Sequence, residues 1–232
     1  MVSGCFGKFD EVERLKEKLS NHKYTHEHHS TRQELIGVVQ LTREATYNNK
    51  PYYEGVVVDQ SMGNIPRLEQ TVDGKYHVIV ETKPVTQFTR FSIFENQYVV
   101  LENSNLQVKG FRVISQALRG TNDFVQFIGF DTQKMFDKFK GIWLARISGR
   151  RGNWQSGTER GDDLEDDDAI GRILKIANKT AIGFYTRYFP QDRMQVSVSA
   201  SGNVSIKGIA SREELYQYVI DELAPFMIDV SG

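Results

Sequence analysis

The chain has 232 residues, of which 39% are hydrophobic and 25% are charged, and its formal net charge is −1. This composition is typical of a globular protein whose core is large enough to fold without a metal or a disulfide. The near-zero charge excludes a global field that would hold a polyanion or an anionic membrane, so any nucleic-acid binding must come from a local patch.

The first residues give no sign of export or membrane insertion. Met1 to Cys5 lacks a basic segment followed by an apolar one, and apolar runs such as Gly55 to Val58 are too short to cross a bilayer. Cys5 is the only cysteine, so no intrachain disulfide is possible, and we expect it in a loose N-terminal segment. We therefore expect a cytoplasmic protein that does not enter a membrane.

Residues 1–30 are predicted to form a charged helix and a connector. Val12, Leu15 and Leu19 share one face of a helix over residues 10–19, which is otherwise rich in Glu, Lys and Arg. Residues 20–30 are polar and contain four of the five histidines. They are expected to connect this helix to the rest of the fold.

The next segment, residues 35–41, is left open between a strand and a helix. Ser30 and Gln33 satisfy a capping box for a helix, whereas Val38 and Val39 favour a strand. The rest of a first α+β half, residues 31–130, is clearer. Strands are expected over 52–59, 75–82, 88–94, 97–102 and 124–130, with a helix over 106–118. Pro66 and Pro84 limit which of these segments can be central strands.

Residues 131–232 are predicted to form a second α+β half with a mobile loop at 148–163. Ser211 and Glu214 form a capping box for the closing helix. Helices are expected over 132–140, 164–178 and from 211 onward, and strands over 141–147, 182–188, 194–200 and 204–207. The alternation over 194–200 puts apolar side chains on one face and Ser and Gln on the other.

The order strand, turn, strand, helix occurs twice, over residues 90–118 and 193–226. A repeated unit of this kind predicts an α+β fold of two related halves, in which a mainly antiparallel sheet is backed by helices.

The second unit reads Val196-Ser197-Val198-Ser199-Ala200-Ser201-Gly202-Asn203-Val204-Ser205-Ile206-Lys207-Gly208 and precedes the capped helix over 211–223. It resembles half of a TATA-binding-protein-like repeat. The resemblance implies a saddle of two repeats, with helices on the convex side and nucleic acid or another partner on the concave side. DNA-binding members are similar to one another in presenting aromatic wedges and basic residues there. The outward positions here are small and neutral, so an architecture is expected but not DNA kinking: Gln195, Ser197, Ser199 and Ser205.

Two clusters are candidate metal ligands. In a helical segment His22, His26 and His29 would share one face, and three imidazoles with an open position suit zinc. The acidic run at 162–168, with Asp162, Asp163 and Asp166 as its candidate ligands, has the oxygen ligands that Mg²⁺ or Ca²⁺ prefers, and a pair of metals would suit phosphodiester hydrolysis. The alternatives are a solvated connector for the histidines and, for the aspartates, side chains that complement a helix N-terminus.

A third candidate site combines arginines with an indole. Four arginines surround Trp154 in residues 146–160: Arg146, Arg150, Arg151 and Arg160. Guanidinium groups beside an aromatic ring are the ingredients of single-strand binding. The alternative is a mobile loop whose arginines pair with the aspartates that follow.

Neither G-x-S-x-G nor a P-loop is present, and no cofactor is expected. The leading hypothesis is a non-catalytic protein that binds a nucleic acid, or an acidic or phosphorylated protein segment, through an open sheet face and the 148–163 loop. One alternative is a metal-dependent phosphoesterase or nuclease using the 162–168 cluster. Another is a structural protein–protein interaction subunit.

Overall fold

The computed structural model describes residues 1–9, 15–20, 22–95, 97–102, 107–119, 126–151, 154–188 and 193–230. The strands of the first half are β1 (Val2–Lys8), β2 (His22–Glu27), β3 (Glu34–Tyr47), β4 (Lys50–Gln70), β5 (Tyr76–Phe94) and β6 (Tyr98–Leu101). Those of the second half are β7 (Gln126–Phe130), β8 (Ile142–Arg151), β9 (Trp154–Arg160), β10 (Asn178–Thr186), β11 (Met194–Ser199), β12 (Asn203–Lys207) and β13 (Met227–Asp229). The α-helices are α1 (Leu15–Leu19), α2 (Gln107–Arg119), α3 (Thr132–Lys138), α4 (Ile170–Ile176) and α5 (Arg212–Tyr218), the last continuing as a π-helical turn and a 3-10 turn.

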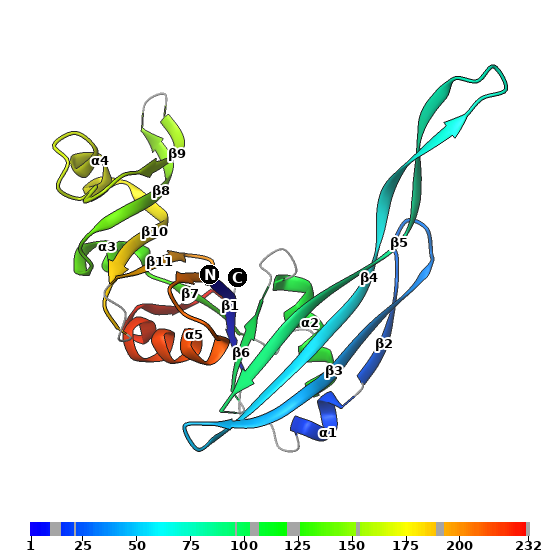
Figure 1. Cartoon of the computed structure of the whole chain (residues 1–232), viewed down its shortest axis with the longest axis horizontal. Coiled ribbons are helices and arrows are strands. Elements are labelled where there is room, and N and C mark those ends of the chain that lie inside the picture. Colours follow the sequence, from blue (N-terminus) through cyan, green and yellow to red (C-terminus); the bar gives the residue numbers. More distant parts are fainter. Residues whose placement is uncertain are drawn as a thin grey trace.

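These strands form one antiparallel sheet that runs through the whole molecule (Figure 1). Its order is β2-β3-β4-β5-β6-β1-β12-β11-β10-β8-β9, with β7 beside β1 and β13 beside β7. The predicted sheet-rich α+β class is confirmed. None of the helices in the described ranges is long and apolar enough to span a bilayer.

The two faces of the sheet carry different cores. In β1, Cys5 belongs to the core formed with α2, whereas the next residue, Phe6, belongs to the core formed with α5. The same switch occurs in β6 between Val99 and Val100. Because neighbouring residues of a strand point to opposite faces, the two cores lie on opposite sides of the sheet. We call these sides the α2 face and the α5 face.

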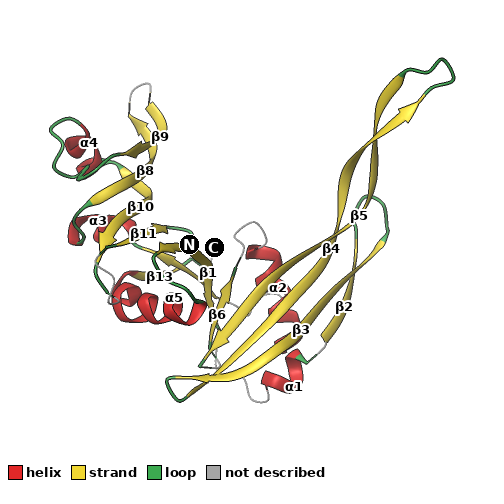
Figure 2. Ribbon diagram, in the orientation of Figure 1, coloured by secondary structure: helices red, strands yellow, loops and turns green. Residues whose placement is uncertain are grey.

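Each face is therefore covered by helices in one half of the molecule and bare in the other. Figure 2 shows the helices in two groups, α1 and α2 beside β2 to β6, and α3, α4 and α5 beside the strands of the second half. Among the described residues, no helix lies on the α2 face over β8 to β12 or on the α5 face over the outer parts of β4 and β5. We call these the two bare regions of the sheet.

The C-terminal unit forms as the sequence predicts. In β11, Met194, Val196 and Val198 are buried while the intervening residues are half-buried. Gly202 adopts a φ of +90° in the turn to β12, a conformation that glycine tolerates. The capping box of Ser211 and Glu214 is present at the start of α5.

The predicted repeat is present as an order of elements, since β5, β6 and α2 are matched by β11, β12 and α5. The two helices lie on opposite faces of the sheet, however, whereas the saddle that the resemblance implies has both on one side. The resemblance to a TATA-binding-protein-like repeat stays a prediction.

The expectation of a loose N-terminal segment is wrong. β1 lies between β6 and β12 in the middle of the sheet, and Cys5 and Phe6 are fully buried. Burial raises the pKa of the Cys5 thiol to about 12, because the thiolate would lose its hydration. This thiol therefore stays protonated and unreactive at neutral pH.

The expected connector at residues 20–30 is wrong as well, since most of it is strand β2. This strand pairs with β3 from His22–Val39 to Glu27–Glu34, which resolves the open segment at 35–41 as a strand. The helix predicted over 10–19 is confirmed at α1, and residues 10–14 lie outside the described part.

The expected mobile loop at 148–163 is instead largely the β8–β9 hairpin. The two strands pair from Leu144–Arg160 to Arg151–Trp154, with a register shift after Ser148. The helix predicted over 164–178 is shortened to α4, because the carboxylate of Asp167 accepts hydrogen bonds from the backbone N–H groups of Ala169 and Ile170. Glu165 turns away from that helix and accepts from the N–H groups of Gly141 and Ile142 instead.

The longest element is a two-stranded arm, residues 61–88, formed by the outer parts of β4 and β5 (Figure 1). β3 pairs with β4 only as far as Asp59, and β6 pairs with β5 only from Phe91. Beyond these points β4 and β5 pair with each other alone, and the ribbon projects away from both cores.

Candidate nucleic-acid interface

The bare half of the α2 face, which we call the platform, is formed by alternate residues of β8 to β12. Pairing in these strands sets opposite residues on the same face. The platform side chains are Arg146, Thr158, Arg160, Tyr185, Gln195, Ser197, Ser199, Ser205 and Lys207. The predicted face of Ser and Gln is thus present on β11 and β12, and three further strands, β8, β9 and β10, extend it.

A cluster of aromatic and basic side chains stands at the β10 side of the platform. The guanidinium carbon of Arg193 lies 3.5 Å from the centre of the Tyr185 ring, which is cation–π geometry. Trp143 lies 6.5 Å from Tyr185 between ring centres, and its indole N–H donates to the carbonyl of Phe184 at 3.3 Å. The indole fits over Gly183, where an added Cβ would come within 2.6 Å of it.

Beside this cluster is an open hollow of about 290 Å³. It is lined by Tyr185, Thr186, Arg187 and Arg193. Two guanidinium groups, a hydroxyl and a phenol ring therefore surround one recess. Guanidinium forks match the oxygens of a phosphate or carboxylate, so the recess has the chemistry of an anion site.

The charge on the platform is of one sign. Arg146, Arg160 and Lys207 are exposed, and the only carboxylate of strands β8 to β12, Glu159, pairs with Ala145 on the other face. Within the described ranges, neither arginine forms an ion pair within 4.0 Å, and neither do Arg187 and Arg193. The predicted alternative, in which the arginines pair with nearby aspartates, is therefore not seen for Arg146 and Arg160. Asp162 is the acidic group at the rim, where it accepts from the Tyr185 hydroxyl at 3.5 Å.

The arginine and tryptophan site predicted from the sequence falls on this hairpin. Arg146 and Arg160 lie on the platform in neighbouring strands. Arg150 and Arg151 are in β8 and Trp154 is in β9, but the side chains of these three residues lie outside the described part. The structure therefore brings two of the five predicted residues together on one face.

The acidic candidates sit in the turns between β9 and α4. Asp163 has a φ of +51°, and Asp166 donates its backbone N–H to the carbonyl of Asp163. Asp167 accepts from the backbone N–H groups of Ala169 and Ile170 where α4 begins, which agrees with the alternative interpretation of this run. Asp162 and its neighbours lie beyond β9, at one end of the strand order.

The histidine candidates lie at the other end of the sheet. His22 and His26 are half-buried in strand β2, so the helical spacing that would align them with His29 does not exist. The His26 ring stacks on Tyr24, with 5.5 Å between ring centres. In the described ranges, no group of three His, Cys, Asp or Glu side chains is placed to hold a metal ion.

Sequence reasoning missed Trp143, Tyr185, Arg187 and Arg193. The sequence could have indicated Tyr185, because it is an odd-numbered residue in a strand whose even-numbered residues Ile182 and Phe184 are buried, so it points to the opposite face. No such signal was available for Trp143, which a register irregularity in β8 turns onto the platform.

No protein-family model matches the chain, and no curated protein matches its sequence.

Proposed function

We propose that the protein is a non-catalytic binding protein whose platform binds single-stranded nucleic acid. The observation that carries the proposal is the pairing of one-sign charge with aromatic rings on an open sheet face. Arginines on the β-strands can neutralise phosphates, and aromatic rings or guanidinium planes can stack on unpaired bases.

The geometry around Tyr185 supports both kinds of contact. Its ring is covered on one side by the guanidinium of Arg193, which keeps a second plane available for stacking. Arg187 lines the adjacent recess, and this recess is large enough to admit a phosphate group. The small platform residues Ser197, Ser199 and Ser205 leave room for a chain to lie across the strands.

Aromatic rings favour nucleic acid over an acidic protein segment. An acidic or phosphorylated peptide would need only the cations, whereas Trp143 and Tyr185 are placed among them on the exposed side of the sheet. Base stacking on such rings contributes about 1–3 kcal/mol per base.

The test is fluorescence anisotropy of a labelled single strand at several salt concentrations. If four arginines contact phosphates, log K falls with log salt with a slope of roughly −3. The double variant Arg146→Ala/Arg160→Ala should weaken binding and make the slope shallower by roughly 1.4. The matched control Arg67→Ala/Lys83→Ala removes the same charge from the arm and should change neither.

Absence of binding at low salt, or equal losses in the two double variants, would contradict the proposal. Binding of a polyglutamate peptide in place of the single strand would assign the platform to an acidic protein partner.

A further inference from the structure

The charged strand residues of the arm all lie on one of its two faces. On the α5 face its strand positions are the even-numbered residues 62–70 and 76–88, and none of these twelve side chains is charged. The strand charges, Arg67, Glu69, Glu81 and Lys83, are all on the α2 face. One face of the ribbon therefore carries all the strand charges, together with Ile65, Ile79 and Val85, and the other face carries none.

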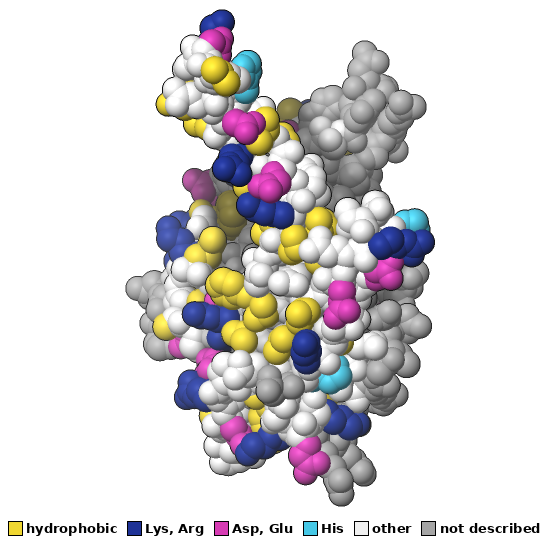
Figure 3. Space-filling model, turned by 90° about the vertical axis from the view of Figure 1, so that its right-hand side faces the viewer, with side chains coloured by type: hydrophobic (Ala, Val, Ile, Leu, Met, Phe, Trp, Pro, Cys, Tyr) yellow, Lys and Arg dark blue, Asp and Glu magenta, His cyan; other side chains and the backbone are white. Residues whose placement is uncertain are grey.

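The uncharged face is exposed along its length. The exposed fractions are 65% for Phe88, 63% for Val80, 65% for Val78, 66% for Tyr76 and 67% for Leu68. Leu68 and Val78 are directly paired across the ribbon, and Phe88 pairs with Val58. Polar pairs interrupt this face at Gln60–Thr86 and at Asn64–Thr82, whose side chains are hydrogen-bonded. Its apolar side chains adjoin one another over the pairs Pro66–Val80 and Leu68–Val78. An exposed apolar patch of this kind often marks an interaction site. In Figure 3, which looks at the molecule from the side to which the arm projects, the arm rises at the top of the view and shows both apolar and charged side chains.

The edges of the arm are less suited to pairing than its face. The pairs Pro66–Val80 and Met62–Pro84 lie four residues apart in a continuous register, so they belong to the same class of pair. A proline fits such a ladder only where its nitrogen points away from the partner strand. Each outer edge therefore lacks one hydrogen-bond donor, which hinders the addition of a further strand.

We propose that the uncharged face of the arm docks against the same face of a second copy of this chain. An isologous contact is self-complementary, and a face without charges brings no like charges together. A ribbon of this length presents a face roughly 40 Å by 10 Å, so two such faces bury about 800 Å², which is the size of a weak, reversible interface. A partner of opposite charge would find nothing to pair with on this surface.

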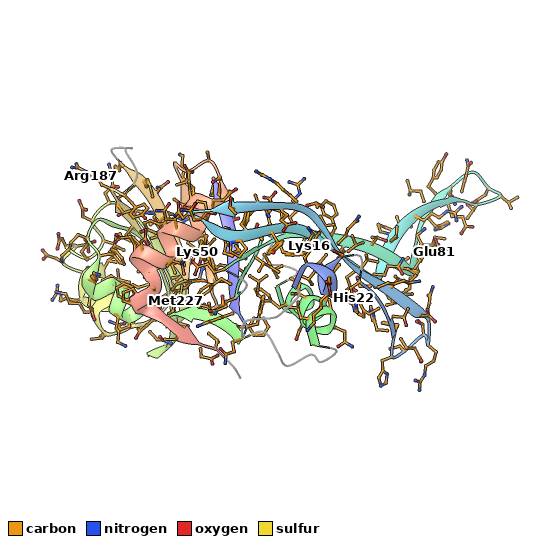
Figure 4. All side chains as sticks on the ribbon, turned by 90° about the horizontal axis from the view of Figure 1, so that it is seen from below. Lys16, His22, Lys50, Glu81, Arg187 and Met227 are labelled. Atoms are coloured by element: carbon orange, nitrogen blue, oxygen red, sulfur yellow. The ribbon has the colours of Figure 1, made fainter. Side chains whose placement is uncertain are left out.

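Two further features fit a second copy. An isolated two-stranded hairpin is marginal in water, and stacking two ribbons gives each a covered face. The arm also projects clear of both cores, with Glu81 on it and Arg187 at the opposite end of the molecule (Figure 4). Two arms can therefore meet without the bodies colliding and without covering the platform.

The test compares Val78→Glu with Ile79→Glu by sedimentation velocity over a range of micromolar concentrations. These adjacent residues lie on opposite faces of the same strand, and Ile79 is paired with Arg67, which accommodates a new carboxylate. The wild type and Ile79→Glu should sediment as dimers, and Val78→Glu should be at least ten-fold weaker in association. Far-ultraviolet circular dichroism should be the same for all three, because the arm lies outside both cores.

A monomeric wild type overturns the proposal. The proposal is also overturned if the wild type binds phosphatidylcholine vesicles and Val78→Glu does not, because that result would assign the face to a lipid surface. A Val78→Glu protein that dimerises as strongly as the wild type would place the contact elsewhere and overturn it equally.

Discussion

The platform and the arm face are the two bare regions of one sheet, and their side chains differ in kind. The platform has arginines, a lysine, serines and two aromatic rings, whereas the arm face is uncharged and mostly apolar, with Asn, Gln and Thr side chains among the apolar ones. Both result from the same cause, since each group of helices covers only one face of one half. The difference therefore comes from the residues at alternate strand positions and not from the fold, which leaves both faces uncovered in the same way.

The contrast between covered and bare positions on one strand should give the largest effect. Phe91 is fully buried on the α2 face of β5, whereas Phe88 is exposed on the α5 face. Phe91→Ala should lower the free energy of unfolding by about 3–5 kcal/mol, and Phe88→Ala by less than about 0.5 kcal/mol. Urea unfolding in the Val78→Glu background measures both without a contribution from association. Similar losses in the two variants would show that the arm face is covered within one chain.

The role of the aromatic ring on the platform can be separated from that of the charges. Tyr185→Leu removes the ring and the support of Arg193, and should weaken single-strand binding by about 1–3 kcal/mol. Because Tyr185→Leu removes no cationic side chain, the slope of log K against log salt should retain at least the contribution of the arginines other than Arg193. Anisotropy titrations at several salt concentrations measure both quantities. An unchanged affinity would remove stacking from the account.

The covered side of the platform half depends on a buried lysine. Lys179 is 1% exposed, and its amine donates to the side-chain carbonyl of Gln133 at 2.7 Å, to the carbonyl of Ala177 at 3.1 Å and to that of Leu174, near the end of α4. Burial lowers its pKa from the ordinary 10.5. Lys179→Met should destabilise the fold by roughly 1–3 kcal/mol, because these carbonyl groups lose their donor.

The pH dependence of this difference has a defined sign. Between the folded and the unfolded pKa of Lys179, the unfolded chain binds the additional proton, so the stability of the wild type rises with pH. Unfolding curves from neutral pH to about 10 should therefore show a widening gap between the wild type and Lys179→Met. A gap that narrows in this window would mean that the charged form is favoured by the fold.

The smallest effect should come from a change that touches neither bare region. Ser211→Ala removes the side-chain cap of α5 and should cost about 1 kcal/mol in unfolding free energy. Single-strand affinity and dimer dissociation should both stay within error of the wild type. A change in either quantity would show that α5 couples the two surfaces, and it would contradict the expectation that the platform and the arm face act independently of this helix.

Local patterns predicted the parts of the fold that follow local rules. The alternation over 194–200 and the capping box at Ser211 and Glu214 needed no information from elsewhere in the chain. β1 was missed because it is short, contains Gly4 and Gly7, and is buried on both faces, so it has no alternation to read. The full length of the arm was not predicted because Pro66 and Pro84 indicate strand breaks in a sequence. A proline is tolerated within a strand where its nitrogen faces a free edge, as both do here.

The candidate site was predicted only in part, for a related reason. Arg146 and Arg160 were identified because they are close in sequence to Trp154. Tyr185 and Arg193 join them only through the pairing of β10 with β8 and β11. Likewise, the spacing of His22, His26 and His29 has meaning for a helix, and the pairing of β2 with β3 decides that it is a strand.

Fluorescence-detected sedimentation of a short labelled single strand with the wild-type protein tests both surfaces at once. At low salt the oligonucleotide should sediment with a species that contains two chains. At high salt it should be released while the chains remain paired, because apolar contacts are not screened by ions. An oligonucleotide that stays unbound at low salt, or that sediments only with single chains, would contradict the account.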